Sequence, residues 1–342
     1  MKAKITRWFE DAWYKEMYIS AWFMPLSMFY VDAVRLRRFL YRTGLKKSVR
    51  LPVPVVIVGN LTVGGTGKTP LVIWLVQLLK QQGYKPGVIS RGYAGDENQQ
   101  PLSVTANSDP RQVGDEALLL ARRCDCPVAV CADRPAAARH LLAENTCDVI
   151  ISDDGLQHYA LQRDIEIVVI DGQRRFGNGY CLPVGPLREP PERVNSVDLV
   201  VVNTPKELLE GEIAMQCKGD SLRNLQSGER QPLAAFAGKA CHAVAGIGNP
   251  QRFFDQLAAA GLNCQTHAFP DHHTFAAADL QFNDAKPVVM TEKDAVKCAA
   301  FAQARHWYLR HWYLPIDAVL PEAFAEKLLT LLKDKTRGQK TA

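Results

Sequence analysis

The sequence predicts an α/β fold, in which a parallel sheet flanked by helices is joined to a smaller second α/β lobe. Three features of the 342-residue chain indicate this arrangement. From Pro52 onward, short apolar runs typical of buried strands alternate with longer stretches of helical character. A glycine-rich turn follows the first of these runs directly. Ahead of it lies a basic, aromatic segment that we expect to be helical and to associate with a membrane.

Composition excludes several classes of protein. With 47% hydrophobic and 23% charged residues, the chain is typical of a globular protein and can hold one large or two moderate domains. The net charge of +5 is mild, and we expect neither a nucleic-acid partner nor an obligate protein partner. The nine cysteines are scattered without a Cys-x-x-Cys pair, which predicts the reduced thiols of a cytosolic protein and argues against a zinc site.

Residues 1–50 differ in composition from the rest of the chain. The stretch 17–31 is apolar and carries no charge, but it is shorter than the ~20 residues needed to span a bilayer. Acidic residues before it and the lack of a small-residue cleavage site argue against a signal peptide. Aromatic residues interleaved with arginines favour helices that lie in the membrane interface. The alternative is a helical hairpin packed against the protein's own core.

The stretch 62–69 reads Thr-Val-Gly-Gly-Thr-Gly-Lys-Thr and joins the apolar run 55–58 to the apolar stretch 71–76. A strand, a glycine-rich turn, Gly-Lys-Thr and a helix form, in this order, the sequence pattern of the P-loop of nucleotide-binding proteins. Glycines let backbone N–H groups close around phosphate oxygens, and the helix start adds the positive end of its dipole. The pattern predicts a P-loop NTPase-like sheet that binds a nucleoside triphosphate, although Thr62 replaces the usual first glycine.

Two segments are expected to serve the triphosphate and its metal ion. In the P-loop, Lys68 is expected to contact the β- and γ-phosphates, and the Thr69 hydroxyl to contact Mg²⁺. The predicted nucleotide-binding residues are Thr62, Val63, Gly64, Gly65, Thr66, Gly67, Lys68 and Thr69. The segment 148–155 is an apolar strand that ends in Asp153 and Asp154. A carboxylate in this position can hold Mg²⁺, and a plain acidic turn is the alternative that the nearby P-loop disfavours.

The remaining predicted elements complete the two lobes, with ligands expected at the carboxyl ends of the strands. In the first lobe we expect strands at 55–58, 87–89, 128–130, 149–151, 166–170 and 198–202, and helices at 68–82, 113–124 and 134–144. In the second we expect strands near 241–247, 263–269, 287–291 and 306–310, and helices near 250–260, 276–281, 294–302 and 321–333. The predicted boundaries are 1–50 for the N-terminal helices, 51–204 for the nucleotide-binding domain, 205–235 for a linker or hinge, and 236–342 for the second lobe.

Three further segments carry side chains suited to catalysis. Asp115 lies at the start of a predicted helix. The alternative to a catalytic role is that this acid only interacts favourably with the helix dipole. His272 lies in an Asp-His-His loop after a predicted strand, where a carboxylate partner would raise its basicity; a surface histidine pair is the alternative. A proline-braced loop presents Arg188 and Glu189, and Arg134 follows another strand. Both arginines suit the recognition of phosphate.

Taken in order along the chain, these motifs resemble one family, the tetraacyldisaccharide 4'-kinases of lipid A biosynthesis. The matching stretches are GNLTVGGTGKTP (59–70), SRGY (90–93), VGDE (113–116), DR (133–134), SDDGLQH (152–158), GPLREP (185–190), DHH (271–273) and TEKD (291–294). The P-loop alone would be generic, whereas GPLREP, DDGLQH and TEKD together are specific. The family's glycine-poor start to the P-loop also accounts for Thr62.

The resemblance implies a kinase that transfers the γ-phosphate of ATP to the 4'-hydroxyl of a tetraacyldisaccharide 1-phosphate, giving a lipid IVA-type product. Enzymes of this family are peripheral proteins on the cytoplasmic face of the Gram-negative inner membrane. The expected cofactors are therefore ATP and Mg²⁺, and the expected partners are the lipid substrate and an anionic membrane surface. The family's catalytic dyad, an aspartate of the GDE motif and a histidine of the DH motif, falls on Asp115 and His272.

The resemblance also implies roles for the other matched residues. These are Lys68, Arg134 and Arg188 for catalysis, Thr69, Asp153, Asp154 and Glu189 for the metal, and Arg91 and Tyr93 for the substrate. Closure of the two lobes about residues 205–235 would bring His272 to the nucleotide. The TEKD stretch receives no role from the sequence.

Two other functions are compatible with a P-loop. A soluble ligase or kinase acting on a small carboxylate or alcohol would keep full activity without residues 1–50. A nucleotide-switched membrane protein would hydrolyse ATP slowly and produce no phosphorylated lipid. The pairing of Asp115 with His272 argues against both, but only through the resemblance.

Overall fold

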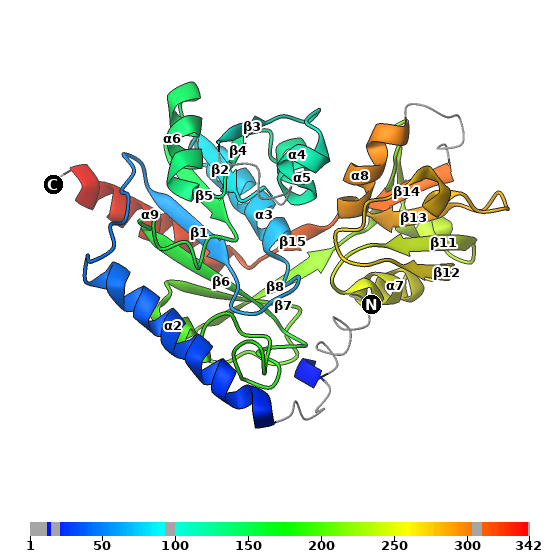
Figure 1. Cartoon of the computed structure of the whole chain (residues 1–342). Coiled ribbons are helices and arrows are strands. Elements are labelled where there is room, and N and C mark those ends of the chain that lie inside the picture. Colours follow the sequence, from blue (N-terminus) through cyan, green and yellow to red (C-terminus); the bar gives the residue numbers. More distant parts are fainter. Residues whose placement is uncertain (1–11, 15–20, 93–99, 303–309, 341–342) are drawn as a thin grey trace.

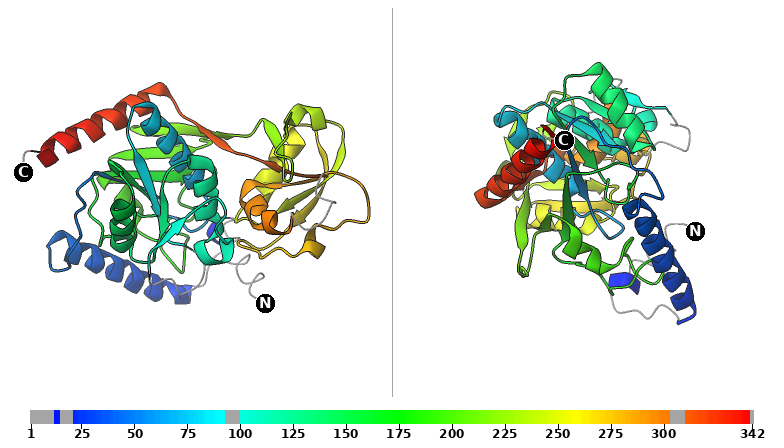
Figure 2. Two further views of the ribbon diagram at one scale, coloured as in Figure 1. Left: turned by 90° about the horizontal axis from the view of Figure 1, so that it is seen from above. Right: turned by 90° about the vertical axis from the view of Figure 1, so that its left-hand side faces the viewer.

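The structure, a computed structural model, describes residues 12–14, 21–92, 100–302 and 310–340 and contains two sheets of nine and six strands (Figure 1). The larger sheet and its helices form the first lobe, and the smaller sheet forms the second lobe beside it. Figure 2 shows the second lobe connected to the first by extended segments of chain. This arrangement confirms the predicted α/β fold with a large, mostly parallel sheet flanked by helices.

The large sheet has the strand order β15-β8-β7-β6-β1-β5-β2-β4-β3. Its strands are β1 (Val55–Gly59), β2 (Pro86–Ser90), β3 (Leu102–Val104), β4 (Val128–Val130), β5 (Val149–Asp153), β6 (Ile165–Asp171), β7 (Leu199–Asn203), β8 (Glu212–Lys218) and β15 (Asp317–Val319). Only the edge strands β3 and β15 are antiparallel to their neighbours. The six strands predicted for this lobe are confirmed, with small differences at their ends.

Helices cover both faces of the large sheet. They are α2 (Met24–Arg42), α3 (Lys68–Gln81), α4 (Pro110–Val113), α5 (Asp115–Cys124), α6 (Arg134–Glu144) and α9 (Glu322–Lys340). Val56 and Val58 of β1 share a hydrophobic core with α3, α5 and α9. Val55 and Ile57 lie in the core on the other face, with α6 and part of α2. Successive strand residues point to opposite faces, so a strand covered on both sides is apolar throughout.

The second lobe is built on a sheet of order β10-β9-β14-β13-β11-β12. Its elements are β9 (Ser221–Asn224), β10 (Arg230–Pro232), β11 (Ala240–Ala245), α7 (Pro250–Ala259), β12 (Asn263–Ala268), η4 (Ala277–Leu280), β13 (Val288–Thr291), α8 (Glu292–Ala302) and β14 (His311–Leu314). The helix expected near 276–281 is a short 3-10 turn. The strand expected at 306–310 is described only from His311, because residues 303–309 lie outside the described ranges. Short 3-10 turns also occur at η1 (Ala21–Phe23), η2 (Pro191–Ser196) and η3 (Leu233–Phe236).

Two parts of the chain differ from the expected domain organisation. Residues 205–235, expected to be a linker, contain β8, which joins the large sheet beside β7. After the second lobe, β15 pairs with β8, and α9 packs its Phe324 and Leu328 into the core of the first lobe. Residues 317–340 therefore belong to the first lobe in space. Neither strand has a clear sequence signal, since β8 is only partly buried and β15 has three residues.

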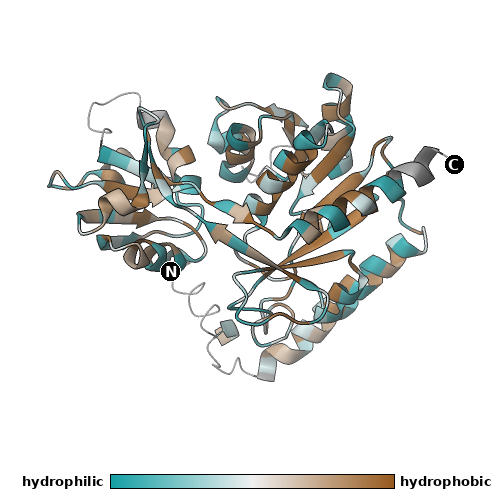
Figure 3. Ribbon diagram, turned by 180° about the vertical axis from the view of Figure 1, so that it is seen from behind, coloured by the Kyte–Doolittle hydropathy of each residue, from teal (hydrophilic) through white to brown (hydrophobic). Residues whose placement is uncertain are grey.

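Helix α2 packs on the first lobe with one face only. Its Ser27 hydroxyl donates to the carbonyl of Cys181 at 2.8 Å, and Tyr30 contributes to the core beneath it. On the remaining surface, several large apolar side chains of α2 and the preceding turn are exposed, among them Trp22, Phe29 and Phe39. Figure 3 shows brown, apolar residues in the sheet strands and also in the N-terminal part of α2. No helix within the described ranges is both long enough and apolar enough to cross a membrane.

Candidate active site

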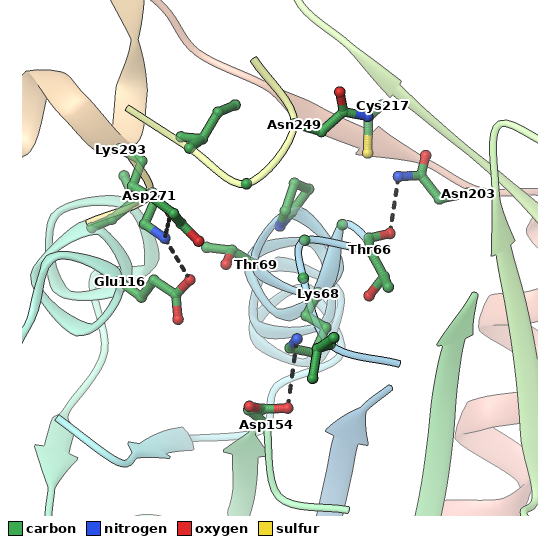
Figure 4. Close-up of a pocket in the computed structure, with 18 of the residues that line it drawn as sticks. Thr66, Lys68, Thr69, Glu116, Asp154, Asn203, Cys217, Asn249, Asp271 and Lys293 are labelled. Atoms are coloured by element: carbon green, nitrogen blue, oxygen red, sulfur yellow. Dashed lines mark hydrogen bonds and ion pairs between the residues drawn. The ribbon is translucent and has the colours of Figure 1, made fainter. Parts of the chain in front are cut away.

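A cavity of about 840 Å³ lies between the two lobes, at the carboxyl ends of the central parallel strands. The first lobe contributes the loop between β1 and α3 and the residues after β5. The second lobe contributes residues 247–249, the loop at 271–272 and the start of α8. Figure 4 shows Lys68 and Thr69 on one wall of this cavity, with Asp271 and Lys293 across from them.

The conformation of the loop between β1 and α3 is fixed by hydrogen bonds within the loop. The buried Asn60 donates through Nδ2 to the carbonyls of Thr62 at 2.7 Å and Gly64 at 3.2 Å, and its Oδ1 accepts from Lys68 Nζ at 3.0 Å. Gly64 and Gly67 have φ angles of 100° and 97°, in the region that favours glycine. Because Gly67 precedes the first turn of α3, free N–H groups of the helix start border the cavity.

Three charged side chains meet beside this loop. The Lys68 ammonium lies 3.5 Å from the Asp154 carboxylate, and Arg188 donates to both oxygens of the same carboxylate at 3.1 and 3.2 Å. Burial favours a higher pKa for Asp154, but Lys68 and Arg188 outweigh it and lower the pKa to about 2. Asp154 is therefore ionised at neutral pH. The backbone of the Arg188 loop also bonds the P-loop, since Val63 donates its N–H to Pro186 at 2.9 Å.

Asp153 and Arg134 lie behind these groups and are almost completely buried. Asp153 Oδ2 accepts a long hydrogen bond of 3.5 Å from Ser90, while its Oδ1 has no hydrogen-bond partner. Burial, with the nearby Glu116 charge, raises the pKa of Asp153. The Arg134 guanidinium donates to the carbonyls of Cys131 and Asp153, and burial lowers its pKa to about 10. Arg134 still borders the cavity as a buried cation.

The residues predicted for Mg²⁺ divide into two groups. Thr69 and Asp154 both line the cavity, and Asp153 precedes Asp154 at the end of β5, beside β1. The Oδ1 of Asp153, which has no hydrogen-bond partner, fits a role as an oxygen donor to a cation. Among the described residues, no cluster of three or more His, Cys, Asp or Glu side chains could hold a metal unaided. Two carboxylates and a hydroxyl suffice for Mg²⁺, which keeps several waters and binds nucleotide oxygens as well.

Glu189, the fourth residue predicted for the metal, lies apart from these three in the structure, and its metal role stays a prediction. Its carboxylate accepts hydrogen bonds from Gln157 at 2.9 Å and Tyr159 at 2.5 Å and pairs with Arg193 at 3.5 Å. The side chain is buried and is not part of the cavity wall. Because both oxygens have partners, Glu189 holds the Arg188 loop in place.

Asp115 and His272 meet across the lobes, although 157 positions separate them in sequence. Nδ1 of His272 lies 3.3 Å from Oδ2 of the buried Asp115, whose carboxylate is also 3.9 Å from Lys293. The hydrogen bond to Asp115 raises the pKa of His272 above its ordinary 6.5, against the opposing effects of burial and Lys293. Burial tends to raise the pKa of Asp115, but His272 and Lys293 lower it to about 2. The pair is therefore an oriented imidazole beside an ionised carboxylate.

The TEKD stretch, to which the sequence assigned no role, joins the two lobes. Glu292 accepts two hydrogen bonds from Arg123 of α5, at 2.6 and 2.8 Å. Lys293 pairs with Glu116 at 3.0 Å and with Asp271 at 3.6 Å (Figure 4). Burial opposes the charge of Lys293, but the surrounding carboxylates raise its pKa. These contacts hold the loop that carries His272 against the start of α5.

Several residues at the cavity were not singled out from the sequence. Asn60 follows β1 directly, and Asn203 ends β7; a polar residue at the end of an apolar strand is the signal that could have identified both. Arg252, on α7, gives no such signal. Of the two predicted substrate-binding residues, Arg91 lines the cavity, whereas Tyr93 lies outside the described residues.

A parallel sheet with cations from a glycine-rich loop on one side of a cavity and a carboxylate–histidine pair on the other is typical of α/β phosphotransferases. Comparison with known families narrows this class. The family model LpxK, tetraacyldisaccharide-1-P 4'-kinase, matches residues 19–333. The chain therefore belongs to the tetraacyldisaccharide 4'-kinase family, as its motifs predicted.

Individual relatives agree with this assignment. The chain is 52% identical to a tetraacyldisaccharide 4'-kinase of Nitrosococcus oceani, over 95% of this chain and 94% of the relative. It is 50% identical to the protein of the same name from Methylobacillus flagellatus, over 97% and 98% of the two chains. Its fold is similar to a crystal structure of LpxK from Aquifex aeolicus in complex with ATP, with a TM-score of 0.78 and 27% identity over 91% of this chain and 98% of that one.

Proposed function

We propose that this protein transfers the γ-phosphate of ATP to the 4'-hydroxyl of a tetraacyldisaccharide 1-phosphate, giving a lipid with one additional phosphate. The observation that carries the proposal is the contact of Asp115 with His272 in the cavity that also contains the P-loop. A nucleotide binder needs the loop alone, whereas transfer to a hydroxyl also needs a proton acceptor. The names of the relatives and the ATP complex of the related structure support the same reaction.

The first-lobe side of the cavity supplies positive charge. Backbone N–H groups of residues 62–69 receive the phosphates, and Lys68 pairs with the β- and γ-phosphates. Thr69, Asp153 and Asp154 would hold Mg²⁺, which when bound offsets negative charge on the triphosphate. Arg134 and Arg188 contribute fixed cations for the charge that gathers on the γ-phosphate oxygens during transfer.

The second-lobe side supplies the base. With Nδ1–H of His272 donated to Asp115, Nε2, which lies 3.8 Å from the Asp271 carboxylate, is the ring nitrogen that would accept the proton of the 4'-hydroxyl. As that proton moves, the hydroxyl oxygen bonds to the γ-phosphorus. The bond between the γ-phosphorus and its bridging oxygen breaks, and ADP leaves with that electron pair. The Asp115 carboxylate stabilises the imidazolium that forms.

Helix α2 supports a lipid acceptor and a peripheral position on the cytoplasmic face of the inner membrane. Its Tyr30 hydroxyl donates to the backbone carbonyl of Arg188 at 3.0 Å, and Tyr30 and Arg37 border the cavity. The same helix also exposes Phe29 and Phe39 to solvent. An acceptor whose acyl chains stay in the bilayer could thus place its sugar in the cavity, near Arg91.

The reaction is tested directly by incubating the full-length protein with Mg-ATP and a tetraacyldisaccharide 1-phosphate in mixed micelles. The expected product, read by mass spectrometry, is heavier than the acceptor by one phosphate and forms together with ADP. ADP without a phosphorylated lipid would instead support a nucleotide-switched protein. Transfer to a small alcohol or carboxylate, with none to the lipid, would support a soluble kinase or ligase.

The pH dependence of kcat/KM should report the base. His272 must be neutral to accept a proton, so activity should rise with pH through an apparent pKa above 6.5, because the bond to Asp115 raises the His272 pKa. Asp115→Asn removes the negative charge and should move this acid limb to lower pH. As the matched control, Asp279→Asn changes the carboxylate that pairs with the neighbouring His273 and should leave the limb in place. An acid limb at the same pH in Asp115→Asn and in the wild type would contradict the assignment of His272, paired with Asp115, as the base.

Vesicle binding should depend on the basic residues of α2. Each arginine near an anionic surface contributes about 1 kcal/mol, so the double variant Arg35→Gln/Arg42→Gln should bind anionic vesicles about 30-fold more weakly. Binding of the wild type should also weaken as salt rises. The matched control is Arg230→Gln, at an exposed arginine of the second lobe. Binding that ignores both lipid charge and salt would favour a helix that serves only to pack on the protein.

A further inference from the structure

We propose that Arg252, on the second lobe, is a positioning residue that holds the P-loop in its binding conformation through Asn203. The proposal rests on the function proposed above and adds a physical connection between closure of the lobes and the shape of the phosphate site. The proposal assigns a role to the buried Asn203 and the partly buried Arg252, which the reaction itself does not require.

The first step links Asn203 to the P-loop. Asn203 ends β7 and is 1% exposed, and its Nδ2 donates to the backbone carbonyl of Thr66 at 3.0 Å (Figure 4). In a trans peptide the C=O and the following N–H point in opposite directions. Fixing the Thr66 carbonyl toward β7 therefore fixes the direction of the Gly67 N–H, one of the loop's candidate phosphate donors. Gly67 packs so closely here that an added Cβ would lie 2.5 Å from Asn203 Nδ2.

The second step links Arg252 to Asn203. Arg252 lies near the start of α7 and donates through Nη2 to Asn203 Oδ1 at 3.1 Å and to the Thr204 hydroxyl at 2.5 Å. Its Nη1 lies 3.5 Å from the buried Asp171 carboxylate, which balances the charge. The guanidinium on Oδ1, with the Thr204 hydroxyl that also donates to Oδ1 at 3.1 Å, determines which end of the Asn203 amide faces the P-loop, because an arginine offers only donors. The amide is thereby oriented with its NH₂ group toward Thr66.

The third step links this contact to the position of the lobes. Arg252 belongs to the second lobe, whereas Asn203, Thr204 and Asp171 belong to the first. The neighbouring Gly248 also lies close to the P-loop, since a Cβ placed on it would be 3.7 Å from the Gly65 nitrogen. Separation of the lobes would withdraw the guanidinium from Asn203. The loop would then hold its phosphate-binding shape less firmly, and nucleotide binding and closure would favour each other.

The test is the affinity for a non-hydrolysable ATP analogue with Mg²⁺, measured by calorimetry on the full-length protein. Arg252→Ala should weaken binding about 10- to 100-fold, the range for loss of hydrogen bonds from a charged donor. Its KM for the lipid acceptor and its melting temperature should stay close to wild type. Arg252→Lys keeps the positive charge beside Asp171 but loses the two-pronged guanidinium. Its nucleotide affinity should fall between those of the wild type and Arg252→Ala. Arg230→Ala, at an exposed arginine of the same lobe, is the control and should bind as wild type does.

A double-mutant cycle with Asn203→Ala separates the relay from a general weakening of the lobe contact. In the Asn203→Ala background, Arg252→Ala should cost less than about 2-fold in nucleotide affinity, because the shared connection is already gone. Losses that multiply would overturn the proposal, as would wild-type affinity in Arg252→Ala. The nucleotide affinities of Arg252→Ala and Arg252→Lys test the same proposal while the buried Asn203 stays unchanged. Nucleotide affinity is read without the acceptor, so failure of the lipid reaction in the wild type would be recognised separately.

Discussion

Replacing His272 with alanine is expected to lower kcat by about 10²–10⁴-fold, the range for loss of a general base, and Asp115→Ala should act similarly. Affinity for ATP should change little in either variant, because neither side chain is required to hold the nucleotide before transfer. The measurement is steady-state phosphorylation of the lipid acceptor together with direct nucleotide binding. The reason is geometric: Nδ1 of His272 lies 3.3 Å from the Asp115 carboxylate, so Nε2 is the ring nitrogen that we propose accepts the hydroxyl proton.

The double variant should be little worse than the more damaging single one, since the two residues act as one unit. His273→Ala is the matched control, because His273 pairs with Asp279 and does not line the cavity. It should retain turnover near that of the wild type. Strictly multiplicative losses, or a large loss of ATP affinity in His272→Ala, would show instead that His272 is a substrate contact and Asp115 a residue that serves the helix start or metal.

Lys68→Ala is expected to lower kcat/KM for ATP by about 10²-fold or more, corresponding to several kcal/mol of lost transition-state stabilisation. Lys68 is the cation of the P-loop and is held by Asn60 at 3.0 Å and by Asp154 at 3.5 Å. Its removal leaves Asp154 paired with Arg188 alone in a largely buried site. The assay is again phosphorylation of the lipid acceptor at varied ATP concentration.

Lys80→Ala provides the control for this substitution on the same helix, α3. Lys80 forms an exposed ion pair with Asp125, and such pairs contribute only about 0–1 kcal/mol to stability. Its turnover should match the wild type. If Lys68→Ala also turned over like the wild type, the assignment of the P-loop as the phosphate site would be untenable.

The contacts between the lobes explain why this chemistry needs both of them. Asp115 and Glu116 come from the first lobe, whereas Asp271, His272 and Lys293 come from the second. Lys293 offsets the repulsion among the three carboxylates, and the Arg123–Glu292 pair holds the same two elements together. The proposed base is therefore assembled only when the lobes are in contact, which agrees with the expectation that closure is a condition for transfer.

Much of the first lobe could be predicted because its signals are local. A buried strand covered by helices on both faces is a continuous apolar run, so β1, β5 and β6 are visible in the sequence. The P-loop is eight consecutive residues whose glycines and lysine are needed at fixed spacing. The edge strand β15 and its neighbour β8 carry no such pattern, and they were therefore missed or assigned to another segment.

From the sequence alone followed the α/β class, the prediction of a phosphate loop with Lys68 and Thr69, and, through the resemblance, the family. The three-dimensional structure was needed to show that Glu189 is buried beside Gln157 and Tyr159, that TEKD joins the lobes, and that Arg252 reaches Asn203. These depend on contacts between residues 30 to 177 positions apart. Such contacts follow from strand order and the seating of one lobe on the other, and neither is encoded in a local pattern of side chains.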